Sequence, residues 1–484
     1  MNWILAWEIA YVIIVILVCL RIVWDTPNIT KALAYLLLVI FVPAIGIFFY
    51  FSFGINYRKR KMYSKKLIQD DAINLHFRDA RIERARALVE KHRAQLGNCM
   101  ELVRMLTNTG GSFLSGDNEL SLLVNGENKF PEVLKVLKEA KHHIHIEYYI
   151  YEDDEIGREI VDILVEKAKS GVEVRFIYDA FGSWSLHKSS VREMQDAGIH
   201  VFPFSRLRFF MLANRLNYRN HRKIIVVDGS TAFVGGINVS KRYVNRKEAA
   251  DQLFWRDTHL KIAGSGVYYL QYLFLCDWNF CSGDKLEPTP QLFPDGTENY
   301  HGHQLMQVAA SGPDSPVPTI LYSMVAAINI ASEEILITTP YFIPGESIMD
   351  AVCIAARGGV KVKILVPGQS DSLIVNAAAR SYYGNLLDAG VEIYLYHKGF
   401  VHAKTLVTDG QLAMVGTANM DNRSFDLNFE VNAVVYDREL AGELRQVFHE
   451  DIKDADRLDA KAWNDRPAYK LLVEKCARLI SPML

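Results

Sequence analysis

The chain has 484 residues, half of them hydrophobic, and a formal net charge of −2. This length suits about two to four domains with ample core, and the balanced charge argues against a general nucleic-acid-binding protein, which usually carries a basic excess. The six cysteines form no Cys-x-x-Cys pair, which is typical of a reducing compartment and argues against a disulfide framework or a zinc site.

The N-terminus contains two apolar stretches. The first, Trp3–Leu20, is interrupted only by Glu8, whereas the second, Ala32–Phe53, carries no charged residue. About 20 apolar residues are needed to cross a bilayer as a helix, so the second stretch is the stronger candidate for a span. The first lacks the basic start and the cleavage site of a signal peptide. We therefore predict a two-helix transmembrane hairpin over residues 1–56, with its turn at Asp25–Asn28.

A strongly basic segment, "YRKRKMYSKK" at residues 57–66, follows the second stretch. The positive-inside rule predicts that this end of the span, and everything after it, lies in the cytoplasm, which makes the chain a multi-pass protein of the cell membrane. The same cations are expected to attract an anionic lipid surface, by about 1 kcal/mol each; alternatively, they act only as a topology signal. Residues 57–105 are expected to form a basic juxtamembrane and helical linker.

Beyond residue 106 the chain consists of two similar halves. For example, "HHIHIEYYIYEDDE" at 142–155 corresponds to "EEILITTPYFIPGE" at 333–346. Strand-like and helix-like segments alternate in both halves, which predicts the α/β class, with a mixed sheet flanked by helices in each half. We predict a first domain over residues 106–295 and a second over residues 296–484, related by a pseudo-twofold axis.

Each half carries the same motif, "HRKIIVVDGSTAFVGGIN" at 221–238 and "HAKTLVTDGQLAMVGTAN" at 402–419. A histidine and a lysine lie two residues apart on a β-branched run, so both side chains point to one face of a strand. Ordinary polar residues at strand edges would not explain why the spacing repeats. Two imidazoles, two ammonium groups and two amides that face one another would form a cage for a phosphate oxyanion: His221, Lys223, Asn238, His402, Lys404 and Asn419.

This set of residues predicts covalent transfer at phosphorus. One neutral histidine attacks, while the other, protonated, donates a proton to the leaving alkoxide and then acts as the base that activates the acceptor. The lysines and asparagines stabilise the charge that develops on the phosphoryl oxygens. Because two fixed cations supply this stabilisation, we expect neither a metal ion nor another cofactor.

Four carboxylates complete the predicted site. Asp228 and Asp409 belong to the motif and lie seven residues after the histidines, near the strand ends, so we expect them to support the catalytic set by organising structure. Asp257 and Glu430 lie on the strands that follow the motifs and are predicted to orient the histidines, since a nucleophilic imidazole needs its other nitrogen fixed by an acceptor.

A metal site formed by His143, His145 and Glu147, which share one face of a strand, is disfavoured because no further ligand follows at a suitable spacing. The segment "FSRLRFFMLANRLNYRN" at 204–220 mixes arginines with large apolar residues. It is interpreted either as an interfacial segment that contacts lipid or as a loop helix packed on the core.

The motifs, the apolar hairpin, "EYYIYEDDEIG", "WRDTHLKI" and "VGTANMDNRSFDLNFE" resemble the phospholipase D superfamily, and within it the bacterial cardiolipin synthases. The resemblance implies condensation of two phosphatidylglycerol molecules, taken from the bilayer, into cardiolipin and glycerol through a phosphatidyl-histidine. It also implies His221 as nucleophile and His402 as acid and then base, although the near symmetry leaves the reverse order open. Where the family usually has Gly-Ser after the motif, this chain has Gly236 and Thr417 in the second place.

Other functions remain as alternatives. Within the superfamily these are a hydrolase, a phosphatidyltransferase that uses another alcohol, and a nuclease, which the balanced charge and the anchor disfavour. From another class, the chain would be a catalytically silent lipid-binding scaffold, but the complete set of histidines and lysines argues against it. The sequence leaves the oligomeric state open.

Overall fold

The computed structural model describes residues 3–26, 29–51, 82–204, 218–245, 253–294 and 302–479. The basic segment at 57–66 lies outside these ranges, and so does most of the segment at 204–220, which we interpret either as an interfacial segment or as a loop helix.

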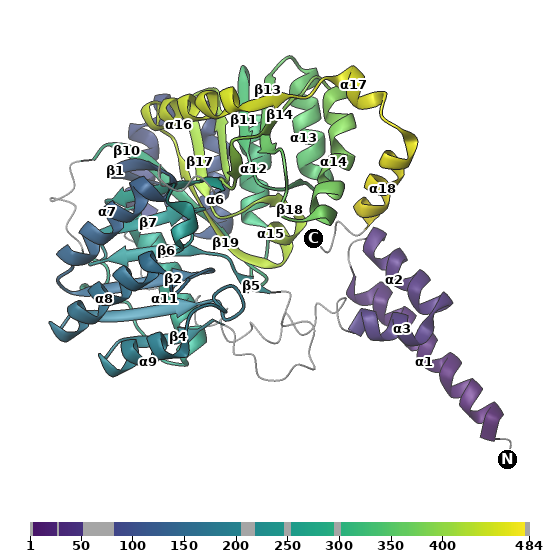
Figure 1. Cartoon of the computed structure of the whole chain (residues 1–484), viewed down its shortest axis with the longest axis horizontal. Helices are drawn as coiled ribbons and strands as arrows, with labels where there is room; N and C mark the ends of the chain where they lie inside the picture. Colours follow the sequence, from purple (N-terminus) through teal and green to yellow (C-terminus); the bar gives the residue numbers. More distant parts are fainter. Residues whose placement is uncertain are drawn as a thin grey trace.

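Three apolar helices lie beside the globular part at the N-terminus: α1 (Trp3–Asp25), α2 (Ile29–Phe41) and α3 (Pro43–Phe49). Figure 1 shows α1 extending away from the globular part. Residues Leu5–Asp25 of α1 are long and apolar enough to cross a membrane, with a mean hydropathy of 2.4. The helices α1 and α2 flank the predicted turn.

The second predicted span is not one continuous helix. Val42 leaves the helical conformation at φ −136° and ψ 66°, and Pro43 starts α3. Proline lacks an N–H group and disfavours the helical conformation of the residue before it, so the helix breaks there. The 13 residues of α2 reach only about 20 Å, less than the hydrocarbon core of about 30 Å. The prediction of an unbroken span over Ala32–Phe53 is therefore wrong, and the first stretch, ranked as weaker, forms the longer helix.

The linker ends in helical residues 82–91, α5 (Arg93–Leu96), the 3-10 turn η2 (Gly97–Cys99) and α6 (Met100–Gly110). Three side chains of α6 are buried in the same core cluster as Ile320 and Met324 of the second half: Leu102, Val103 and Leu106. The linker thus packs on the second half before the first half begins.

The first half alternates strands and helices as the sequence predicts. Its elements are β1 (Ser115–Val124), α7 (Asn125–Glu139), β2 (His143–Tyr148), α8 (Glu155–Lys169), β3 (Glu173–Tyr178), α9 (Lys188–Asp196), β4 (His200–Pro203), β5 (Arg219–Asn220), β6 (Lys223–Val227), β7 (Thr231–Gly235), η3 (Lys241–Tyr243), β8 (Phe254–Arg256), β9 (Thr258–Ala263) and α11 (Val267–Ser282).

The second half repeats this plan. Its elements are β10 (Gln304–Ser311), α12 (Thr319–Asn329), β11 (Glu334–Thr338), β12 (Phe342–Ile343), α13 (Glu346–Arg357), β13 (Lys361–Pro367), α14 (Leu373–Asp388), β14 (Glu392–Tyr396), β15 (Gly399–Val401), β16 (Thr405–Thr408), β17 (Leu412–Gly416), β18 (Met420–Asp421), α15 (Asn422–Asp426), β19 (Asn428–Val435), α16 (Arg438–Asp451), the 3-10 turn η5 (Ile452–Asp454), β20 (Ala455–Arg457), α17 (Ala460–Asn464) and α18 (Ala468–Leu479).

The two halves share one 16-stranded mixed sheet. From its centre, the first half runs β1-β9-β7-β6-β2-β3-β4, and the second runs β10-β19-β17-β16-β11-β13-β14 in matching order. The halves meet where β1 and β10 pair antiparallel, with Ser115 opposite Met306. This arrangement confirms the predicted α/β class with two equivalent halves, and the boundaries at residues 106 and 296 remain a prediction.

Two short strands cross from one half to the other. The strand β5, just before the first motif, pairs parallel with β19, and β15, just before the second, pairs parallel with β8. The first motif therefore begins against the strand that carries Glu430, and the second begins against the strand that ends just before Asp257.

Candidate active site

The two motif histidines lie at the seam between the halves. The backbone N–H of His221 donates to the Phe429 carbonyl at 2.9 Å, and that of His402 donates to the Arg256 carbonyl at 2.7 Å. These bonds extend the crossing strands by one residue, so each histidine lies next to a strand of the opposite half.

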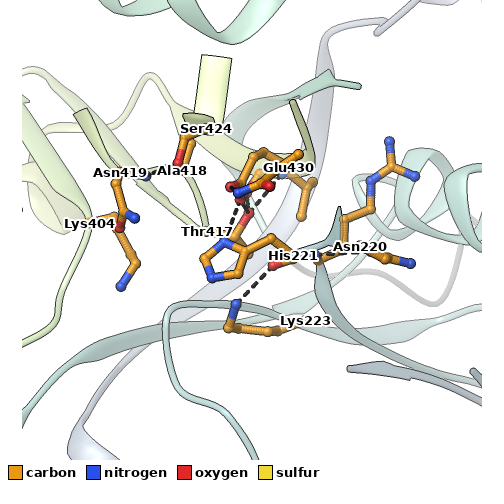
Figure 2. A network of polar contacts seen from close by, with 12 residues as sticks. Asn220, His221, Lys223, Lys404, Thr417, Ala418, Asn419, Ser424 and Glu430 are labelled. Carbon is orange, nitrogen blue, oxygen red and sulfur yellow. Dashed lines mark hydrogen bonds and ion pairs between the residues drawn. The ribbon is translucent and has the colours of Figure 1, made fainter. Parts of the chain in front are cut away.

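The two orienting carboxylates also act across the seam. His221 Nδ1 lies 2.9 Å from Glu430 Oε2, and His402 Nδ1 lies 2.7 Å from Asp257 Oδ2. Both carboxylates are fully buried. An ionised carboxylate only accepts hydrogen bonds, so each Nδ1 carries the hydrogen and each Nε2 is left for a substrate. Figure 2 shows Lys404 and Asn419, from the second half, facing the imidazole of His221.

The residues after the motifs make room for these carboxylates. A Cβ at Gly236 would lie 2.1 Å from Asp257 Oδ1, so only glycine fits there. In the second half Thr417 Oγ1 donates to Glu430 Oε2 at 2.5 Å (Figure 2). The threonine hydroxyl therefore supports the carboxylate, and Gly236 supplies no hydroxyl in the first half.

Both lysines are buried beside their histidines. Lys223 Nζ donates to the His221 carbonyl at 2.8 Å, while Lys404 Nζ lies 2.9 Å from His402 Nδ1 and donates to the His402 carbonyl. Burial lowers the pKa of Lys223 to about 7 and that of Lys404 to about 8, although the nearby carboxylates favour the charged forms. The lysines therefore keep much of their positive charge at neutral pH.

Burial also lowers the pKa of both histidines, to about 4 for His221 and about 3 for His402. Glu430 and Asp257 oppose this shift, and the lysines add to it. Without substrate both imidazoles are neutral at pH 7, which suits a nucleophile. A nearby anion would raise the pKa of either imidazole and favour its protonated form.

The two motif aspartates lie away from this site. Asp228 accepts hydrogen bonds from the backbone N–H groups of residues 141–143, and Asp409 accepts them from those of residues 332–334. Seven residues of extended chain separate them from the histidines by roughly 20 Å. Both have positive φ, 51° and 52°, and close the turn after the motif strand. They organise the loop before β2 or β11 and do not reach the phosphate cage.

The histidines open into a pocket of about 460 Å³, whose lining includes both asparagines. Both ends of the Asn238 amide form hydrogen bonds within the protein: Nδ2 donates to the Tyr243 hydroxyl at 2.8 Å, and Oδ1 accepts from the Ile150 N–H at 3.3 Å. By contrast, Asn419 Oδ1 is buried and accepts no hydrogen bond.

Two aromatic residues that the sequence analysis left out pack on the histidines. The Tyr149 ring lies edge-on to His221 at 4.8 Å between centroids, and the Trp255 ring lies 5.6 Å from His402. Both line the pocket. Each lies two residues from a carboxylate already singled out, Tyr149 after Glu147 and Trp255 before Asp257, and this closeness in sequence was the available signal.

Within the described ranges, no group of three histidine, cysteine or acidic side chains could hold a metal ion. The candidate trio is part of the core: His145 Nδ1 accepts from Gln271 Nε2 at 2.8 Å, its Nε2 lies 3.2 Å from Arg175 Nη1, and Glu147 accepts from the Asn220 amide.

Comparison with known proteins agrees with this geometry. The family described as "Cardiolipin synthase, PLD-like domain" matches residues 133–259 and 324–452. A cardiolipin synthase of Geobacillus sp. (strain WCH70) is 44% identical over 91% of this chain and 86% of its own length. The chain belongs to the cardiolipin synthase family. The major cardiolipin synthase of Bacillus subtilis (strain 168) is 37% identical over 98% of both chains.

This membership confirms the resemblance inferred from the motifs, and with it the enzyme class of a phosphatidyltransferase of the phospholipase D type. Among solved structures, phosphatidylserine synthase of Haemophilus influenzae Rd KW20 aligns with a TM-score of 0.57 at 15% identity, covering 79% of this cardiolipin synthase-family chain and 99% of its own. At that identity the match supports the fold alone.

Proposed function

We propose that this chain makes cardiolipin by transferring the phosphatidyl group of one phosphatidylglycerol to a glycerol hydroxyl of a second, with release of glycerol. The observation that carries the proposal is the pair of buried histidines, each held by a carboxylate of the opposite half and open to one pocket. Such a pair supplies a nucleophile and an acid on one phosphodiester.

In the first step His221 Nε2 attacks the donor phosphorus, and the bond between phosphorus and the glycerol oxygen breaks. His402 gives its proton to the departing oxygen, so free glycerol leaves and a phosphatidyl group stays on His221. Glu430 stabilises the positive charge that forms on the imidazole. Lys223 and Lys404 stabilise the phosphoryl oxygens, and the Asn419 side chain lines the pocket beside them.

In the second step a hydroxyl of the acceptor lipid attacks phosphorus. His402, now neutral, takes the hydroxyl proton, the bond from phosphorus to His221 breaks, and cardiolipin leaves. One phosphodiester replaces another, so the two sides are close in energy. The choice of acceptor then depends on what fills the pocket. Hydrolysis, or transfer to another alcohol, would follow from a pocket that admits water or that alcohol.

The same proposal places the enzyme on the cytoplasmic side of the cell membrane. The apolar helix α1 crosses the membrane and anchors the chain, α2 and α3 pack beside it, and the basic segment at 57–66 binds the anionic lipid surface. An anchored site faces a dense supply of phosphatidylglycerol, which favours a lipid hydroxyl over water.

A lipid assay tests the proposed reaction. Purified enzyme is given phosphatidylglycerol liposomes with a metal chelator, and mass spectrometry measures cardiolipin, phosphatidic acid and glycerol. We expect cardiolipin and glycerol in equal amounts, and none from His221→Ala or His402→Ala. Phosphatidic acid as the main product would identify a hydrolase, and no product would favour another donor lipid or the silent scaffold.

The roles of the two histidines are tested by trapping. Wild-type enzyme is quenched in neutral denaturant, because the bond between phosphorus and the histidine nitrogen is labile in acid, and is then digested and searched for a phosphatidyl adduct. We expect it on His221, and an adduct on His402 would reverse the assignment.

A further inference from the structure

The pocket of a cardiolipin synthase has to accept two anions. The donor phosphodiester occupies the cage of histidines and lysines. The acceptor, under the function proposed above, is a second phosphatidylglycerol, which brings its own phosphodiester one glycerol unit away from the reacting phosphorus. A negative charge so close to the first requires compensation, because like charges in a partly buried site repel strongly.

Arg219 is placed where it could bind the second phosphodiester. It lies on β5, two residues before His221, and lines the pocket although only 4% of its surface is exposed. Its Nε is buried without a hydrogen-bond partner. Its guanidinium lies 4.2 Å from the centroid of the Phe181 ring, which is 55% exposed.

The acidic residue that acts most strongly on the charge of Arg219 is Asp179, and its carboxylate accepts hydrogen bonds from the backbone. Asp179 accepts from the backbone N–H groups of Phe181, Gly182 and Asn220, at 2.9–3.2 Å. Among the described residues Arg219 forms no ion pair. A buried guanidinium with unused donor capacity is costly without an anion.

A second arginine, Arg423 on α15, lines the same pocket. It is close enough to Arg219 to lower the pKa of that guanidinium, and both arginines act on the hydroxyl of Tyr149. The Tyr149 ring packs edge-on against His221. Arg219 and Arg423 therefore repel each other beside His221, outside the cage of histidines and lysines. A bound anion would reduce this repulsion.

The two aspartates that line the pocket form hydrogen bonds with other groups. Asp371 accepts from the Tyr341 hydroxyl at 2.7 Å, and Asp421 accepts from the Ser424 N–H at 2.7 Å as the N-cap of α15. Burial raises the pKa of Asp421 to about 6, so part of it is uncharged near neutral pH.

The pseudo-twofold symmetry supplies an internal comparison. Four residues after the motif asparagines, Arg242 of the first half matches Arg423 of the second. Arg242 is paired with Glu152 and lies 5.7 Å from the Trp255 ring centroid, but the residue that matches Glu152 is Ile343. Only the second half therefore leaves this arginine without its acid.

Arg219 breaks the symmetry as well, since Phe400 precedes His402 by the same two residues. The uncompensated positive charge thus lies on one side of the pocket, that of His221. The two halves have the same fold but different charges at the pocket. This difference fits a reaction in which the donor lipid and the acceptor lipid play different parts.

We propose that Arg219 and Arg423 bind the phosphodiester of the acceptor phosphatidylglycerol and thereby select an anionic lipid over water or a neutral alcohol. Their guanidinium groups hold the acceptor while its glycerol hydroxyl loses a proton to His402 and attacks the phosphatidyl group on His221. They take no part in bond breaking.

The test compares two acceptors with the same donor. In phosphatidylglycerol liposomes, cardiolipin formation requires the anionic acceptor, whereas incorporation of isotope-labelled free glycerol into phosphatidylglycerol uses a neutral one. We expect Arg423→Gln to lower cardiolipin formation at least tenfold and glycerol exchange less than threefold. Arg219→Gln should do the same, and Arg219→Lys, which keeps the charge, should recover part of the loss.

The matched control is Arg242→Gln, which removes the paired arginine at the equivalent position and should change the ratio of the two rates less than twofold. Equal losses of both rates in Arg423→Gln would overturn the proposal, since the arginine would then serve the donor or the fold, and so would unchanged rates. If the wild-type enzyme exchanges glycerol but makes no cardiolipin, the proposed function itself fails.

Discussion

At the scale of single residues, the site contains six ionisable groups whose charges depend on one another. Burial lowers the pKa of both histidines and both lysines, and the carboxylates Asp257 and Glu430 oppose this. The carboxylates themselves stay ionised because the histidines and lysines hold their pKa below the ordinary value despite burial. The negative charge of an entering phosphodiester would therefore change the protonation of the histidines and lysines.

This balance predicts a pH profile. Lysine is charged below its pKa, and since that of Lys223 is lowered to about 7, the stabilising charge is lost as the pH rises above 7. Protonation of His221 below about pH 4 removes the nucleophile. We expect kcat/KM, which reports the free enzyme, to fall above pH 7 towards a tenfold loss per unit.

The profile is measured in mixed micelles of phosphatidylglycerol and neutral detergent, with binding of enzyme to micelles followed separately at each pH. A kcat/KM that stays constant from pH 7 to 9 would contradict the assignment of a lowered lysine pKa.

At the scale of elements, the crossing strands decide which carboxylate serves which histidine. Asp257 and Glu430 were recognisable in the sequence because they lie on strands that follow the motifs, but their partners were not. The strands β5 and β15 have two and three residues, too few for any periodic pattern, and their pairing with β19 and β8 is a long-range contact.

The N-terminal helices show the opposite case. The break between α2 and α3 had a local signal in the sequence, Pro43, but the prediction of one span was based on the number of consecutive apolar residues and did not use it. The helix–strand alternation of the two halves, by contrast, repeats over many residues, and the sheet follows it.

The crossing of β15 over β8 can be tested at Gly399. A Cβ there would lie 2.0 Å from the Phe254 carbonyl oxygen, so Gly399→Ala has to push the two strands apart. We expect a loss of about 1–3 kcal/mol in stability, as for other overpacked sites, and at least a tenfold fall in kcat, because His402 moves away from Asp257. Thermal unfolding and the cardiolipin assay measure the two effects.

The matched control is Gly442→Ala in α16, where an added Cβ meets nothing within 4 Å. Alanine in place of a helical glycine should stabilise by up to about 1 kcal/mol and leave kcat unchanged. If Gly399→Ala lowers stability but keeps full activity, the crossing strand does not position His402.

At the scale of the whole molecule, the active site belongs to neither half. The first half holds His221 and the carboxylate of His402, and the second holds His402 and the carboxylate of His221. The halves are joined by the β1–β10 pair and by a core cluster that contains side chains of both, such as Leu120 and Val431. The active site is therefore assembled by packing between the two halves, and it does not depend on the peptide connection between them.

Chain cleavage tests this sharing. Fragments 1–295 and 296–484 divide the chain at the predicted boundary, between the buried Phe293 and the start of β10. Each fragment alone lacks one histidine and misplaces the other, so we expect activity near background from either. Expressed together they should recover activity, because the sheet and α6 still pack across the seam, and Asp257→Asn in the first fragment should lower the recovered rate about 100-fold or more by releasing His402 of the second. Activity from a single fragment would show that one half completes a site with another copy of itself, and the order of the two histidines would then lose its meaning.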